Sequence, residues 1–108
     1  MSTELLSQID MLEKACHAAL RAGDDAETIA LLALTLTTVR FPISQDERPL
    51  VRGLAKLAST HAAMLLDALN AGRPKAVVHN GLTRVCDSLA ELREALQDEG
   101  APAHRAAS

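Results

Sequence analysis

The sequence has no Trp or Tyr, and Phe41 is its single aromatic residue among 108. Aromatic and β-branched residues, which β-strands prefer, are sparse, whereas Ala and Leu together exceed a third of the chain and favour helix. An all-β fold and a doubly wound fold are therefore excluded. A chain of this length forms one domain. Such a domain buries roughly two thirds of its unfolded surface and folds without stabilising disulfides or bound metal ions.

The chain also has few cysteines and no long hydrophobic run. Cys16 and Cys86 cannot form a disulfide framework, and their spacing matches no zinc pattern. The longest apolar stretch, Ile29 to Leu36, is far shorter than the about 18 residues that a membrane span needs. The first residues lack the basic region of a signal peptide. We expect a soluble protein of the reducing cytoplasm.

Motifs that carry chemistry are missing as well. The chain has no glycine-rich phosphate loop, no nucleophile elbow, no His-Glu-x-x-His and no Glu-x-x-His pair. We therefore predict no enzymatic activity and no cofactor. His61 occupies a stripe position, and we interpret it as a boundary histidine bonded to a carbonyl or hydroxyl group. The alternative is a metal or small-ligand bundle that uses His61, His79 and a cysteine from different helices.

Apolar residues at alternating steps of four and three predict two helices in the first 40 residues. The first stripe consists of Leu5, Ile9, Leu12, Cys16 and Ala19, and Gly23 ends this helix. Asp24, followed three residues later by Glu27, indicates the start of a second helix over about 25–40. Pro42 forces Phe41 out of helical geometry, so this helix stops there.

Two longer helices are predicted after a loop from Phe41 to Glu47. A helix capped at Asp46 or Arg48 keeps Pro49 in its first turn and runs to Asn70. Pro74 suits the first position of the last helix, which ends at residues 100–102. Residues 1–100 therefore form one domain, and residues 101–108 form a loose tail.

Short connections make consecutive helices antiparallel neighbours. We predict an all-α fold, an antiparallel four-helix bundle whose last two helices form a long hairpin. The second helix is shorter than the others, so a lone monomer does not cover both faces of this hairpin along its whole length. We therefore expect a homodimer, because most soluble oligomers are two-fold dimers.

Charge is distributed unevenly along the chain, whose net charge is −3. Arg48, Arg52 and Lys56 follow at four-residue spacing and form one basic ridge on the third predicted helix. The ridge is either a solvated face or a docking strip for an acidic partner. In a second copy of the chain, that partner is the acidic face of Asp87, Glu91 and Glu94. Nucleic acid is a poor candidate partner, because no aromatic residues are available for stacking on bases.

The last predicted helix carries the most regular stripe, which includes Val85, Leu89 and Leu92. This stripe is either core or part of a groove for a partner helix. Strong interface residues are often Tyr or Trp, which this chain lacks. A partner would therefore contribute its own large side chains to an Ala, Leu and Met surface.

The layout resembles small flagellar and type III export chaperones. A helical pair over Leu5–Val39, broken at residues 22–25, precedes a long helix. The residue pattern of 48–69 is similar to that of the third helix of filament-cap chaperones. The resemblance covers about Leu5 to Asn80; the long regular fourth helix departs from it. It implies a cytosolic, non-enzymatic protein that shields a helical segment of an export substrate. We predict a non-catalytic binding protein, an export-type chaperone or a regulatory adaptor, that sequesters a helical segment of a partner protein. Besides the metal or small-ligand bundle, a small regulator associated with DNA is the alternative.

Overall fold

The computed structural model of the chain describes residues 2–22, 25–41 and 48–99. The described residues form four helices and no β-strand, which confirms the predicted all-α fold. The helices are α1 (Ser2–Ala22), α2 (Ala26–Thr38), α3 (Pro49–Asn70) and α4 (Lys75–Glu99). None of these described helices combines the length and the apolar character that a membrane span requires. The predicted tail and most of the predicted loop after Phe41 lie outside the described residues.

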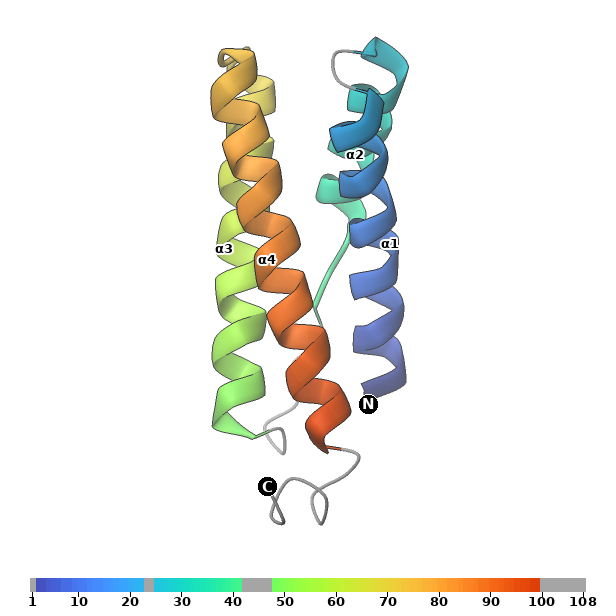
Figure 1. Ribbon diagram of the computed structural model, residues 1–108, viewed down its shortest axis with the longest axis vertical. Coiled ribbons are helices and arrows are strands. Elements are labelled where there is room, and N and C mark those ends of the chain that lie inside the picture. The colour runs from blue at the N-terminus through green and yellow to red at the C-terminus, as the bar shows by residue number, and fades with distance from the viewer. Residues whose placement is uncertain (1, 23–24, 42–47, 100–108) are drawn as a thin grey trace.

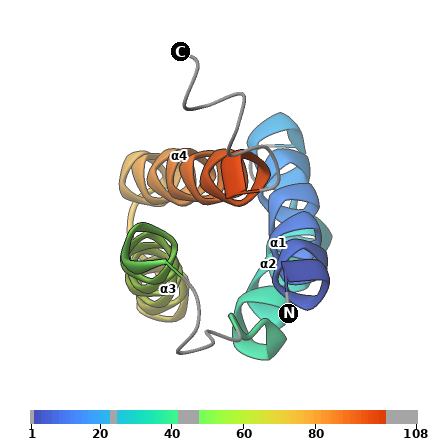
Figure 2. The same ribbon diagram turned by 90° about the horizontal axis from the view of Figure 1, so that it is seen from below.

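The helices form two antiparallel hairpins, α1–α2 and α3–α4, that pack side by side (Figure 1). Each helix contacts the two helices next to it in the order α1, α2, α3, α4 and back to α1, and Figure 2 shows this ring from one end. The contact between α3 and α4 is the most extensive, and that between α2 and α3 is the least. The predicted long C-terminal hairpin is therefore confirmed.

One core runs along the inside of this ring. The stripe predicted for the first helix is buried in full, from Leu5 to Ala19. Facing it are Val51 and Leu65 of α3 and the regular stripe of α4. Val39 is buried beyond the end of α2, and Phe41 packs against the same core. The extended segment after α2 therefore covers part of the core that this short helix does not reach.

The start of α2 lies one residue later than the capping pattern predicts. Asp25 is the N-cap, and its carboxylate accepts hydrogen bonds from Thr28 N at 3.0 Å and from Thr28 Oγ1 at 2.6 Å. Thr28 provides two donors to one carboxylate, which explains why Asp25 caps the helix. The helix ends at Thr38, earlier than predicted, because Val39 is already extended, with φ −65° and ψ 137°.

The ends of the long hairpin follow the proline and glycine positions. Arg48 is the N-cap of α3 and Pro49 its first residue, which agrees with the predicted cap at Asp46 or Arg48. Gly72 has a φ of 64°, and Arg73 N donates to Ala68 O at 3.0 Å, so α3 ends in a Schellman motif. Pro74 lies just before α4, where its carbonyl accepts from Val78 N.

Candidate binding cavity

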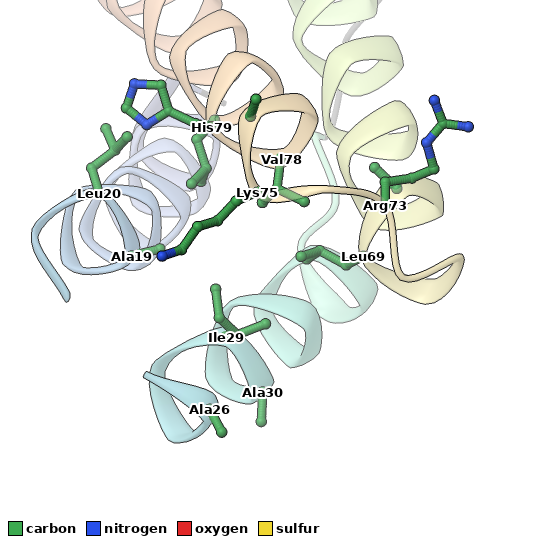
Figure 3. Close-up of a pocket in the computed structure, with 13 residues that line it drawn as sticks. Ala19, Leu20, Ala26, Ile29, Ala30, Leu69, Arg73, Lys75, Val78 and His79 are labelled. Carbon is green, nitrogen blue, oxygen red and sulfur yellow. The ribbon is translucent and has the colours of Figure 1, made fainter. Parts of the chain in front are cut away.

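A cavity of about 790 Å³ lies between the two hairpins, at the end of the bundle that carries their turns. We call this end the open end, because Figure 1 shows the hairpins farther apart there than at the opposite, closed end. All four helices line the cavity (Figure 3). Its lining consists of Ala19, Leu20, Ala26, Ile29, Ala30, Ala68, Leu69, Arg73, Lys75, Ala76, Val78, His79 and Leu82.

The cavity exists because the facing helix surfaces carry small side chains. Five of the lining residues are alanines, and α1, α2, α3 and α4 each contribute at least one of them. An alanine cannot fill the space between helices that a leucine fills, so the hairpins do not close on each other here. The volume lies within the range of about 300–1,000 Å³ that is usual for ligand pockets.

The polar groups of the lining are basic. They are Arg73, Lys75 and His79, and no acidic residue lines the cavity within the described part of the chain. Figure 3 shows Lys75 reaching from α4 toward Ala19 of α1, whereas Arg73 points away from the other labelled residues. An apolar lining with basic residues among its members suits an apolar ligand that carries negative charge.

The predicted basic ridge does not belong to this cavity. Lys56 lies 12 residues before the cavity residue Ala68, which is about 18 Å along α3. Arg48 Nη2 donates to the carbonyl of Ala95 in α4 at 2.9 Å, so this guanidinium anchors the closed end. The Arg52 and Lys56 side chains have no hydrogen bond or ion pair to any described residue. Only these two are available to a partner without breaking a contact.

The structure places Val85, Leu89 and Leu92 in the core. Each has an exposed fraction of 0%, so none of them contributes to a surface in this arrangement. The interpretation of this stripe as a partner groove is replaced by the alternative, in which it is core. Its even spacing reflects intramolecular packing against α1 and α3.

The residues of the alternative metal site do not converge. His61 Nδ1 lies 2.5 Å from Ser88 Oγ, so His61 bonds to a hydroxyl group, as predicted. His79 lines the cavity instead. Within the described ranges, no group of three or more His, Cys, Asp and Glu side chains could hold a metal ion. The geometry therefore does not support the metal bundle.

Cys16 and Cys86 do meet, although they are far apart in the sequence. Both are free thiols whose side chains interact between α1 and α4. The hydrogen bond to Cys86 and burial raise the pKa of the Cys16 thiol well above its usual range. The hydrogen bond from Cys16 lowers the pKa of the half-buried Cys86. Cys86 is therefore the more easily ionised thiol of this pair.

A second link between α1 and α4 was not predicted from the sequence. Arg93 forms ion pairs with Asp10 and Glu13, and these hydrogen bonds raise the pKa of the Arg93 guanidinium. The acidic pair is visible in the sequence as neighbours one turn apart on the first helix. Nothing local, however, connects them with an arginine 80 residues later. Such a pair depends on how the hairpins dock.

Compared with protein-family models, curated proteins and solved structures, the chain matches none of them. The resemblance to export chaperones therefore stays a prediction. A functional assignment for this chain depends on its residues and their geometry.

Proposed function

We propose that this protein is a non-catalytic binding protein that captures a helical segment of a partner protein at the open end of the bundle. The observation that carries this proposal is the apolar cavity of about 790 Å³ between the hairpins. In helix-in-groove recognition, apolar side chains from one face of an amphipathic helix enter such a groove. The alanines of the lining leave room for larger side chains that the partner supplies.

The charge of the lining suggests the chemistry of the partner. Arg73 and His79 line the cavity, and no described lining residue is acidic. A segment with an aliphatic face and acidic flanking residues would complement this site. Arg73 and His79 would therefore orient the partner, in place of the predicted docking strip of Arg48, Arg52 and Lys56.

The favoured class is an export-type chaperone or a regulatory adaptor, because both sequester a helical segment without a chemical step. The titratable groups of the described lining are all basic, and this set resembles no acid–base or nucleophilic constellation. The two free cysteines suit the reducing cytoplasm, where we place the protein. A homodimer is also part of this proposal.

Site-specific photo-crosslinking tests the proposal. A photoreactive residue replaces Ala30 or Ala76, which are exposed and line the cavity, and the control position is Ala90, which is exposed elsewhere on α4. After irradiation in the native cell, we expect adducts at the two cavity positions and none at Ala90. Mass spectrometry should map each adduct to an amphipathic helix with acidic residues. Adducts of equal yield at all three positions would show that the cavity is not the binding site.

A second candidate function is supported by the size of the cavity. Its volume falls within the range of small-ligand pockets, and its lining suits an aliphatic chain with an anionic head group. Native mass spectrometry of the purified protein distinguishes the two functions. A stoichiometric bound amphiphile that organic solvent extracts would favour the small ligand, whereas a protein free of such a ligand favours the partner helix.

A further inference from the structure

α3 carries a second apolar seam that no part of the described chain covers. Successive residues of this seam are three or four positions apart, which is the spacing at which two helices pack. We call this set the outer seam: Leu50, Gly53, Leu57, Thr60 and Met64. Its three large side chains are 60%, 42% and 56% exposed, in chain order. The core seam of α3, from Val51 to Leu69, is separate and faces the other helices.

Gly53 is an independent sign of a partner at this seam. An added Cβ at Gly53 would meet nothing within 4 Å, so packing inside the chain does not require glycine here. Glycine in a helix interior is less stable than alanine. At a position between Leu50 and Leu57, it lets the backbone of another helix approach closely. This inference does not depend on the cavity, which lies between the hairpins.

Charges flank the outer seam on both sides. On the side away from α4, α3 carries the half-buried Arg52, the exposed Lys56 and, further along, the exposed Asp67. On the other side lies α4, since Arg84 and Met64 line one small depression. From Arg84, exposed residues at steps of three, four and three form one face of α4. They are Arg84, Asp87, Glu91 and Glu94.

The two sides have opposite charges at matching heights along the hairpin. The contacts of Arg48 with Ala95 and of His61 with Ser88 fix the relative heights of α3 and α4. Interpolation between these contacts places Arg52 and Lys56 level with Glu94 and Glu91. The same register places Asp67 within about one turn of Arg84. Positive charges on one side of the seam thus correspond to negative charges on the other, and the reverse holds at Asp67.

We propose that two copies of this chain pair through their outer seams with the two α3 helices parallel. A two-fold axis along α3 places the basic side of each copy against the α4 face of the other. Arg52 and Lys56 then meet Glu94 and Glu91 of the second copy. In an antiparallel pair, the basic ridges would instead lie beside each other and repel. Charge complementarity therefore selects a second copy as the occupant and the parallel orientation as its pose.

Single-cysteine crosslinking tests the orientation. The background carries Cys16→Ala and Cys86→Ser, and Leu50→Cys and Met64→Cys are added one at a time. A parallel pair brings each position close to its own copy, so both variants should form disulfide-linked dimers on oxidation. In an antiparallel pair with Leu57 near the axis, the copies of either position would lie about 20 Å apart along the axis. The control is Leu34→Cys on α2, which is 59% exposed and should not crosslink.

Sedimentation equilibrium with intact native cysteines tests the interface itself. We expect a dimer for the unmodified chain, a dimer dissociation constant raised by more than about tenfold in Leu57→Glu, and no change in Leu34→Glu. Lys56→Glu should weaken the dimer several-fold, and adding Glu91→Lys should restore it.

Gly53→Ala distinguishes loss of the interface from loss of folding. It should raise the thermal stability of the helix and still weaken the dimer. A chain that is monomeric at millimolar concentration, or a dimer unaffected by Leu57→Glu, would overturn the proposal. A dimer in which neither Leu50→Cys nor Met64→Cys crosslinks would overturn the parallel orientation.

Discussion

The two ends of the bundle differ in how their helices fill the space between them. At the closed end, Leu5 and Ile9 of α1 and Leu92 and Leu96 of α4 are buried. At the open end, alanines occupy many of the facing positions and a cavity remains. The same chain therefore packs one end with large side chains and leaves a cavity at the other. Side-chain volume at the facing positions, more than the helices themselves, separates the closed end from the open end, where we propose that a partner binds.

The largest expected effect is a difference in stability between leucines of the two ends. Leu92→Ala should destabilise the protein by about 2–5 kcal/mol, because Leu92 is fully buried. Leu69→Ala, in the half-buried lining of the cavity, should cost only about 1 kcal/mol. Chemical denaturation of both variants measures the difference. Equal losses would show that the open end is packed as tightly as the closed end.

The reactivity of the two thiols measures how well the contact between α1 and α4 protects Cys16 from solvent. Cys86 is half-buried with a lowered pKa, whereas Cys16 is buried with a raised pKa. A thiol reagent should modify Cys86 at least about tenfold faster, which corresponds to about 1.4 kcal/mol. Peptide mapping after brief labelling measures the ratio. Equal rates would mean that the contact between α1 and α4 opens often enough to expose Cys16 to the reagent.

Filling the cavity should make the open end more like the closed end. Ala30→Leu adds methylene groups beside the apolar lining and should stabilise the protein by up to about 1 kcal/mol. It should also abolish crosslinking of a partner at Ala76. Ala90→Leu on the exposed surface of α4 is the matched control and should change neither property. Retained crosslinking in Ala30→Leu would contradict the assignment of the cavity as the binding site.

The smallest effect concerns the cap at the open end and its dependence on pH. Hydrogen bonds from Thr28 lower the pKa of Asp25, so the folded state favours the charged carboxylate. This contribution is present above the unfolded pKa and disappears as pH falls through the lower, folded pKa. Asp25→Ala should therefore lower the melting temperature slightly at neutral pH and not in strong acid. Melting curves that differ equally at both pH values would contradict this role.

Some elements of the fold were predictable because their causes are local. The start of α3 follows from Pro49 and the end of α3 from Gly72, since each fixes a backbone conformation within one turn. The start of α2 was predicted one residue too early, because Asp24 and Asp25 both match a cap. Only the position of Thr28 relative to Asp25 distinguishes them. The hydroxyl partner of His61 was predicted as a class, but Ser88 itself was not.

The sequence by itself determined four helices, their approximate ends and the stripes that they bury, because helical periodicity and capping act over a few residues. Only the tertiary structure decided that Arg48 anchors α4, that the two cysteines meet and that Val85, Leu89 and Leu92 are inaccessible. It also decided where the cavity lies. These features depend on the relative positions of helices that are far apart in the chain, and side-chain volumes summed over several helices set those positions.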